Sequence, residues 1–257
     1  MAMLGHQRVG KGPLPVLVLN DWISDTSSWE AARPYLDERR FEWIFTDVRG
    51  YGRSRDLAGR YVLEEVCGDV LELADALGLR RFALVGHSMS SLAVYQLAQR
   101  HPERLLRGVV LGPVPPRGLG VPPEVGDYLE SLGRGDDAAR LEGLRATWGD
   151  RLSEGWLHFK AERWRAVAKP EAAAAYARMF ARDGLPDPER PLRVPLLAVT
   201  GEQDGPPMRR AAVEQSMSPL CEQLEIVALA DTGHYPMQEA PPLTVAVVER
   251  FLAAGAG

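Results

Sequence analysis

Short, continuous apolar runs and stretches with helical spacing alternate along the first half of the chain. Apolar residues recur at helical spacing over residues 63–77, and further helices are predicted over residues 89–100 and 27–36, the last starting at a serine pair. Between them lie four runs rich in β-branched and aromatic residues, as buried strands are, at 14–19, 42–46, 82–85 and 106–111. This alternation predicts an α/β fold with a mostly parallel central sheet flanked by helices.

The pattern changes after Leu111, where several prolines interrupt regular structure. From about residue 124 to residue 180 only helices are predicted. Strands then return at 194–200 and 223–229, with helices at 208–216 and 243–252. The sequence therefore predicts an α/β core of residues 1–114 and 186–257, interrupted by an all-helical cap insertion of residues 115–185.

Charge and composition narrow the class of partner. The 257 residues carry 30 basic and 35 acidic side chains, a net charge of −5, and only Lys11, Lys160 and Lys169 are lysines. The arginines are scattered among acidic residues, which argues against a nucleic-acid groove or a membrane-binding patch. Neither a signal-peptide pattern nor an apolar run long enough to span a bilayer occurs, so a cytoplasmic location is predicted. The sequence leaves the oligomeric state open.

The two cysteines lie far apart in the sequence. Cys67 falls on the apolar face of a predicted helix, so we expect a buried free thiol there rather than a disulfide or a metal ligand. The chain contains no C-x-x-C or H-x-x-x-H cluster, and the sequence indicates neither a metal site nor a cofactor.

Ser88 occupies the position with the clearest chemical signal. The apolar strand that precedes it breaks at Gly86, and a helix begins at once. Such a strand-to-helix turn exposes a serine hydroxyl, which is a poor nucleophile without an adjacent base. Ser54 is the rival in a second G-x-S sequence, but it lies in a polar turn with no strand directly before it. The usual sequence of such a turn is G-x-S-x-G, and this chain departs from it by carrying Ser90 in place of the second glycine.

A nucleophilic serine needs a base and an orienting acid. Asp204 follows the strand predicted at 194–200, and His234 lies on a glycine-flanked turn after the last predicted strand. The carboxyl ends of parallel strands meet at one edge of a sheet, so we expect these side chains to lie near Ser88. The order Ser, Asp, His is that of one class of serine hydrolase. Glu202 is the alternative acid.

Four motifs in the expected order show that the chain resembles the α/β-hydrolase superfamily, in its capped esterase and lactonase-like branch. They span residues 47–54, 86–89, 200–204 and 233–234. The resemblance covers nearly the whole chain and implies the α/β-hydrolase fold. It also implies that Ser88 is the nucleophile, His234 the general base and Asp204 the orienting acid.

The same resemblance points to an oxyanion hole made of two backbone N–H groups. Met89, directly after the nucleophile, supplies one, and Trp22 is the expected second donor. Asn20 and Asp21 stand where relatives often carry His-Gly. Asp21 would bring a carboxylate close to a developing oxyanion, so it must point away, be neutralised by a neighbour or mark altered chemistry.

An apolar stripe runs through the predicted cap, comprising Trp148, Leu152, Trp156 and Phe159. It serves either to pack the cap on the core or to roof a substrate pocket. Tyr235 and Met237 flank the histidine. We predict that Trp156, Phe159, Tyr235 and Met237 contact the substrate, an uncharged and partly hydrophobic acyl compound.

These observations predict a cofactor-independent serine hydrolase that cleaves a carboxylic ester or a lactone. Hydrolysis of a carbon–carbon bond in a β-diketone, and perhydrolysis, remain open because the same triad can perform them. A ligand sensor with slow turnover is a third alternative, and Asn20 and Asp21 are the features that favour it.

Overall fold

A seven-stranded sheet forms the centre of the computed structural model, which describes residues 3–148, 151–186 and 188–254. The order of the strands is β1-β3-β2-β4-β5-β6-β7, and only β1 runs antiparallel to its neighbour, β3. The strands are β1 (His6–Val9), β2 (Leu14–Leu19), β3 (Phe41–Thr46), β4 (Phe82–His87), β5 (Leu105–Leu111), β6 (Leu196–Gly201) and β7 (Leu224–Leu229). This confirms the predicted α/β fold with a mostly parallel sheet.

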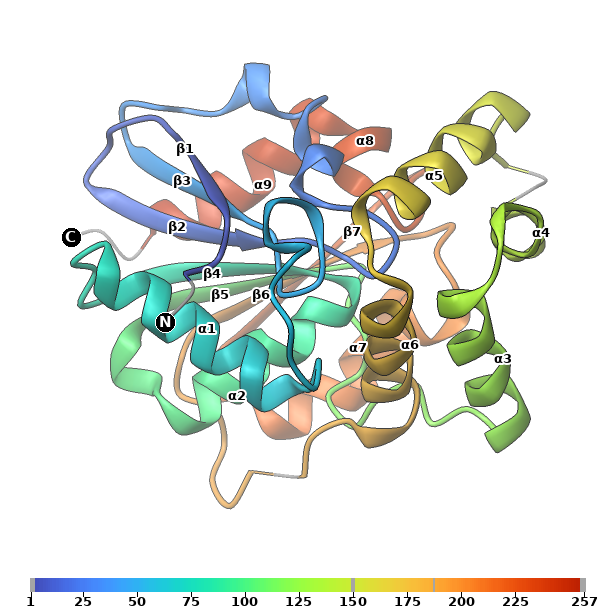
Figure 1. Cartoon of the computed structure of the whole chain (residues 1–257). Helices are drawn as coiled ribbons and strands as arrows, with labels where there is room; N and C mark the ends of the chain where they lie inside the picture. The colour runs from blue at the N-terminus through green and yellow to red at the C-terminus, as the bar shows by residue number, and fades with distance from the viewer. Residues whose placement is uncertain (1–2, 149–150, 187, 255–257) are drawn as a thin grey trace.

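Helices cover both faces of this sheet (Figure 1). One face carries α1 (Leu63–Ala76) and α2 (Ser91–Arg100), and α2 contacts β4 and β5. The opposite face carries α9 (Pro241–Ala253), which follows the short helix α8 (Pro236–Glu239). Helix α7 (Arg210–Met217) joins β6 to β7 and contacts both strands. Parallel strands depend on such crossover helices, because each connection must return to the start of the next strand.

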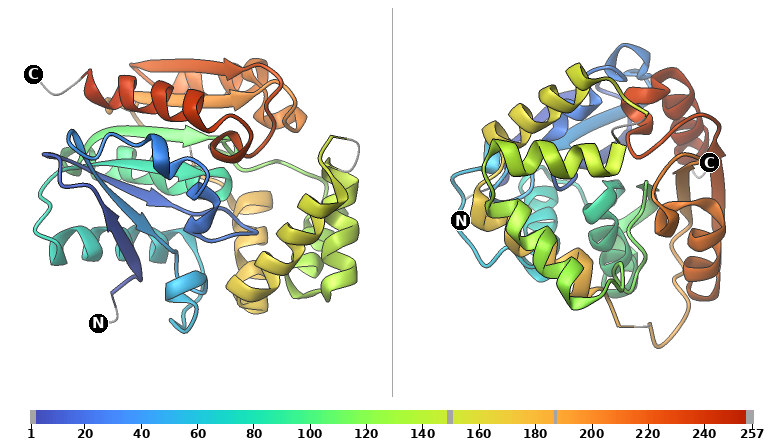
Figure 2. Two further views of the ribbon diagram at one scale, coloured as in Figure 1. Left: turned by 90° about the horizontal axis from the view of Figure 1, so that it is seen from above. Right: turned by 90° about the vertical axis from the view of Figure 1, so that its right-hand side faces the viewer.

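The chain between β5 and β6 forms helices joined by loops in its described residues, and these helices lie at the side of the molecule where the parallel strands end (Figure 2). We call residues 123–183 the helical insertion. It comprises α3 (Pro123–Arg134), α4 (Asp137–Trp148), α5 (Glu154–Val167), α6 (Pro170–Arg178) and a π-helical turn (Met179–Asp183). At its base the Leu119 N–H donates to the Phe180 carbonyl at 2.9 Å and the Leu185 N–H to the Pro116 carbonyl at 2.7 Å. Residues 149–150, which the sequence placed in this helical stretch, lie outside the described residues.

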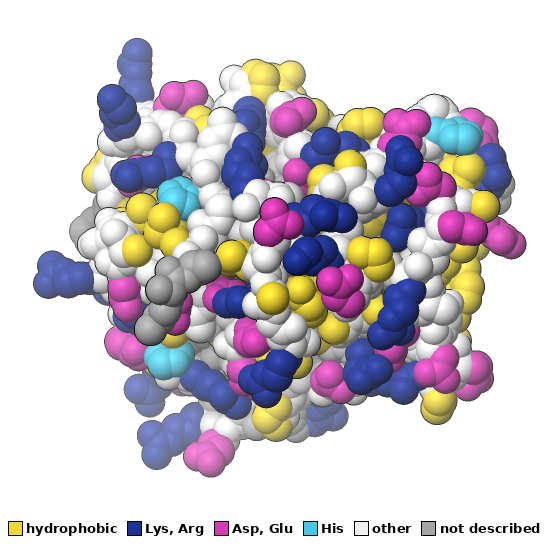
Figure 3. All heavy atoms as spheres, viewed as in Figure 1, with side chains coloured by type: hydrophobic (Ala, Val, Ile, Leu, Met, Phe, Trp, Pro, Cys, Tyr) yellow, Lys and Arg dark blue, Asp and Glu magenta, His cyan; other side chains and the backbone are white. Residues whose placement is uncertain are grey.

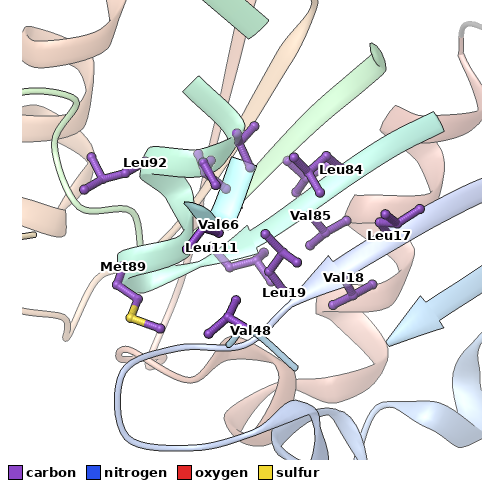
Figure 4. Packing of buried hydrophobic residues seen from close by; sticks show 14 of the residues in the cluster. Leu17, Val18, Leu19, Val48, Val66, Leu84, Val85, Met89, Leu92 and Leu111 are labelled. Atoms are coloured by element: carbon purple, nitrogen blue, oxygen red, sulfur yellow. The ribbon is translucent and has the colours of Figure 1, made fainter. Parts of the chain in front are cut away.

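Branched and unbranched apolar side chains from β2, β4, β5 and α1 interlock in the core (Figure 4). Val18, Leu84 and Val109 are fully buried, as expected of strands covered on both faces. Met89, at the turn after β4, continues this packing towards the edge where the strands end. The turn that carries Ser88 therefore packs directly against the hydrophobic core.

Two details of the sequence prediction are wrong or incomplete. Residues 27–36 form no α-helix but two 3-10 turns, Thr26–Trp29 and Arg33–Tyr35. Asp25 caps the first, accepting from the Ser27 N–H at 3.2 Å, and Pro34 lacks the N–H that a continuous helix needs. The edge strand β1 was missed because it is short and mostly polar, and it pairs on one side only.

Basic and acidic side chains are intermixed on the face shown in Figure 3. Many form surface ion pairs, such as Arg104 with Asp75 at 2.6 Å. No described helix is both long enough and apolar enough to cross a membrane. Cys67 and Cys221 are free thiols, and Cys67 is buried, as predicted.

Replacing Trp43 by alanine should lower the free energy of unfolding by about 3–5 kcal/mol, because this fully buried ring packs against Trp29, Phe41 and Phe45 at centroid distances of 5.5–6.4 Å. Urea unfolding would measure the change. Tyr35→Ala is the matched control, since Tyr35 is 52% exposed and its loss should change stability by less than about 0.5 kcal/mol. Equal effects of the two substitutions would contradict this account of the core.

Candidate functional site

The turn after β4 holds Ser88 in a strained backbone conformation. Ser88 has a φ of +54°, and a 3-10 turn over Ser88–Ser90 leads directly into α2. Gly86 makes this turn possible, because a Cβ at that position would lie 2.5 Å from the Ser90 carbonyl oxygen. A left-handed serine costs free energy, and such residues cluster where a side chain must be aimed. Here the left-handed conformation directs the Ser88 hydroxyl away from the edge at which the parallel strands end.

Ser88, His234 and Asp204 form one hydrogen-bonded series. The Ser88 Oγ lies 2.9 Å from His234 Nε2, and His234 Nδ1 lies 2.9 Å from Asp204 Oδ2 and 3.1 Å from Oδ1. All three side chains are buried, and each follows the carboxyl end of a different strand. The structure thus brings together the three side chains named from the sequence. Their catalytic roles stay a prediction.

The surroundings of the His234 and Asp204 side chains favour a charged pair. Burial acts to lower the pKa of His234, but Asp204, with smaller contributions from Asp21 and Glu239, outweighs it, so the pKa lies above its ordinary value. Burial acts to raise the pKa of Asp204, but His234 and the Gly205 N–H hold it below its ordinary value. A Cβ on Gly112, at the end of β5, would lie 2.9 Å from His234 Nδ1. Only a glycine leaves room for the pair there.

Asn20 and Ser90 tie the loop after β2 to the Ser88 turn. The Asn20 amide donates to the carbonyl oxygens of Asp21 and Ser24 at 2.9 and 2.8 Å and accepts from the Val48 N–H at 2.8 Å. The Ser90 hydroxyl donates to the Asn20 carbonyl at 2.5 Å. Asn20 and Ser90, which both depart from the usual family pattern, therefore hold the loop after β2 in place by hydrogen bonds.

The surroundings of Asp21 favour the second of the three outcomes left open by the sequence, a balance of its charge by a neighbour. Its carboxylate is buried and accepts hydrogen bonds from the Ser24 and Tyr235 hydroxyls. Burial acts to raise the pKa of Asp21, but Lys160 and His87 lower it, so that the net pKa lies below its ordinary value. Asp21 is therefore an anion held by hydrogen-bond donors on two separate segments, the loop after β2 and the turn after β7.

Trp22 lies between the core and the helical insertion. Its indole Nε1 donates to the Ala173 carbonyl at 2.7 Å, its ring packs edge-on against Trp164 and Phe180, and its own carbonyl accepts from the Tyr51 hydroxyl at 2.6 Å. These contacts fix the backbone whose N–H is the predicted oxyanion donor. Met89, the other predicted donor, is 1% exposed and is the middle residue of the 3-10 turn. Both donor roles remain predictions.

Three of the four predicted substrate-contacting side chains lie near His234. Tyr235 and Met237 are fully buried, and the Trp156 ring lies 5.6 Å from that of Tyr235. Phe159 is 48% exposed and lines a surface hollow with Leu152, so the structure does not bring it to Ser88. The predicted stripe is not continuous, because α4 ends at Trp148 and α5 begins at Glu154. Trp148 instead lies 6.1 Å from the His234 ring.

The weaker candidates lie outside the hydrogen-bonded series of Ser88, His234 and Asp204. The Ser54 hydroxyl accepts from the Gly5 N–H at 2.8 Å, as a turn hydroxyl does. Glu202 is exposed, away from the His234 imidazole that Asp204 contacts. His87 donates from Nε2 to the His234 carbonyl at 2.7 Å, and burial lowers its pKa to about 4, so the ring is neutral. It packs beside the candidate base as a neutral donor.

Sequence reasoning missed Lys160 and Ser24, which are linked by hydrogen bonds to Asp21. Lys160 is 1% exposed, and its Nζ donates to the Ser24 hydroxyl at 3.1 Å. The available signal was the rarity of lysine in a chain whose positive charge is almost all arginine. Nothing in the sequence distinguished Ser24 from other loop serines.

Comparisons with known proteins place the chain among enzymes of related fold. A family model described as the alpha/beta hydrolase fold matches residues 15–241. RutD of Caulobacter vibrioides, provisionally named a carbamate hydrolase, is 34% identical over 110 residues, 41% of either protein's length. A non-heme haloperoxidase of Rhodococcus erythropolis is 26% identical over 207 residues, 74% of each protein. The solved enol-lactonase of Burkholderia xenovorans LB400 matches with a TM-score of 0.83 at 25% identity, covering 97% of this chain and 96% of that one.

Asp204→Asn should lower the pKa of His234, because the substitution removes the carboxylate that contributes most to raising it and leaves burial opposed only by the smaller effects of Asp21 and Glu239. An NMR titration of the imidazole nitrogens would measure the pKa. Glu202→Gln, on the same loop but exposed, is the matched control and should leave the titration unchanged. An unaltered or higher pKa in Asp204→Asn would show that this carboxylate does not hold the imidazole.

Proposed function

Because the chain belongs to the alpha/beta hydrolase fold family, we propose that it is a cofactor-independent serine hydrolase that cleaves a carboxylic ester or a lactone. The observation that carries the proposal is the series of hydrogen bonds from Ser88 through His234 to Asp204, each at 2.9 Å. Similarity to a solved enol-lactonase over nearly the full length of both chains supports the substrate class.

The proposed reaction is two-step acyl transfer. His234 Nε2 removes the proton of the Ser88 hydroxyl as its oxygen attacks the substrate carbonyl, and Asp204 keeps the imidazole in the required tautomer. The backbone N–H groups of Trp22 and Met89 stabilise the oxyanion, a contribution of about 3–4 kcal/mol for each donor in comparable enzymes. The protonated His234 gives its proton to the leaving alcohol. A water molecule, deprotonated by the same nitrogen, then releases the acid and restores Ser88.

The pH dependence follows from His234. Its neutral form is the base, and Asp204 raises its pKa, against the effect of burial. The protonated imidazole therefore persists to a higher pH than in a free histidine. On the acidic side, activity should rise with pH as His234 loses its proton.

We assign the helical insertion the role of a cap, with predicted boundaries at residues 115 and 185. The aromatic rings of Trp148, Trp156 and Tyr235 contact one another at centroid distances of 5.6–6.1 Å. Such rings suit an uncharged, partly hydrophobic small molecule. A cytoplasmic location is the setting we propose for this reaction.

Perhydrolysis, in which hydrogen peroxide replaces water in the second step, is a second candidate. The similarity to the haloperoxidase of Rhodococcus erythropolis favours it. A panel of esters, lactones and β-diketones, offered with water alone or with peroxide and analysed by product mass, would separate these reactions. A ligand sensor would instead release one equivalent of product and then turn over more slowly than about 1 s⁻¹.

Ser88→Ala should reduce hydrolysis of short-chain p-nitrophenyl esters about a thousandfold or more, because no other group can form the acyl-enzyme. Release of p-nitrophenol measures the rate. Ser54→Ala is the matched control from the rival motif, and folded Ser54→Ala should retain turnover because its hydroxyl bonds only to the backbone of Gly5 among the described contacts. Undiminished turnover in Ser88→Ala would refute the proposed function.

A further inference from the structure

A buried lysine of the helical insertion contacts the loops of the candidate site without belonging to the Ser88 series. Lys160, on α5, is 1% exposed. Its Nζ lies 3.1 Å from the Ser24 Oγ and 3.8 Å from the centroid of the Tyr235 ring. An ammonium group this deeply buried is costly unless a counter-charge and hydrogen bonds accompany it.

Ser24 links this ammonium to Asp21. The Ser24 hydroxyl accepts from Lys160 and donates to Asp21 Oδ1, while the Tyr235 hydroxyl donates to Asp21 Oδ2. We call Lys160, Ser24, Asp21 and Tyr235 the Asp21 network. It joins α5 of the insertion to the residue before Trp22 and to the residue after His234. One network therefore spans the predicted oxyanion loop and the histidine loop.

Asp21 is the carboxylate available to Lys160. The other charged groups that act on this lysine are Asp25 and Arg163, and these two bond to each other at 2.7 and 2.8 Å. His87, whose Nδ1 lies 4.0 Å from Asp21 Oδ2, is neutral because burial lowers its pKa to about 4. Loss of the Lys160 charge would therefore leave Asp21 as a buried anion with no cation beside it.

We propose that Lys160 is a positioning residue for the hydrolytic reaction, whose ammonium neutralises Asp21 and so holds the Trp22 backbone and the His234 turn in their working geometry. The inference rests on the proposed function, because it concerns the reactivity of Ser88. An unneutralised Asp21 would move towards solvent or take up a proton, and either change would weaken or rearrange its hydrogen bonds to Ser24 and Tyr235. Displacement of catalytic groups by about 1 Å is enough to cost about a hundredfold in rate.

The proposal predicts an alkaline loss of reactivity separate from the titration of His234. Burial lowers the pKa of Lys160 to about 8, although Asp21 and Asp25 act to raise it. The ammonium is therefore present at neutral pH and is lost above about pH 8. Rising pH can only convert more His234 into the neutral form that acts as the base, so the titration of His234 alone would give no decline.

The experiment measures the second-order rate of Ser88 modification by a small fluorophosphonate between about pH 6 and pH 9.5, with the site of labelling read by mass spectrometry. We expect the wild-type rate to fall above about pH 8. Lys160→Met should react about ten- to a hundredfold more slowly at pH 7 and lack that decline. Lys160→Met combined with Asp21→Asn removes both charges and should recover most of the rate. Lys169→Met, a lysine of the insertion outside the network, should match the wild type.

Tyr235→Phe tests the network without altering its charge. It removes the hydroxyl that bonds to Asp21 and keeps the ring, so the rate should drop while the alkaline decline remains. This variant and the wild-type profile decide the question even where Lys160→Met fails to fold.

A wild-type rate that does not decline up to pH 9.5 would overturn the inference. So would a folded Lys160→Met with the wild-type rate and profile. In both cases labelling of Ser88 would leave the proposed function intact. The proposed function itself fails where the probe does not label Ser88 and Ser88→Ala keeps its turnover, a result that involves no variant of Lys160.

Discussion

The left-handed backbone at Ser88 is the constraint on which the site depends. A strand that is buried on both faces has no natural way to present a polar side chain, and the turn from β4 into α2 provides one by reversing φ at a single residue. The reversal is sterically possible only because Gly86 carries no side chain against the Ser90 carbonyl. The close packing of the strands offsets the free-energy cost of the left-handed backbone at Ser88. The same packing therefore makes the sheet rigid and fixes the direction of the Ser88 hydroxyl.

Much of this arrangement could be predicted from the sequence because it depends on strand order. Ser88, Asp204 and His234 each follow the end of a strand, and strands that alternate with helices place their ends at one edge. The positions therefore follow from periodicity and chain order, with no need for exact loop geometry. The short 3-10 turns at residues 26–35 could not be predicted this way, because a capping aspartate and one proline override the helical spacing.

The residues that escaped prediction are those whose partners come from distant segments. Asp21 was recognised as a problem, but its solution lies 139 positions later in Lys160 and 214 positions later in Tyr235. Local pattern carries no information about which helix of an insertion will pass over a given loop. Phe159 shows the converse, since its helical spacing predicted an inward-facing residue, whereas the stripe is interrupted between α4 and α5 and Phe159 is exposed.

The bond from the Trp22 indole to the Ala173 carbonyl joins the loop after β2 to α6 of the helical insertion. The Tyr176 hydroxyl likewise donates to the Arg49 carbonyl at 3.0 Å. The core loops and the helical insertion thus form hydrogen bonds with each other, and each depends on the other for its conformation. A chimera that exchanged this insertion for one from a relative would lose the contacts that hold the loop after β2. New substrate ranges in such a protein would have to arise by substitution within the existing helices, or by exchanging loop and insertion together.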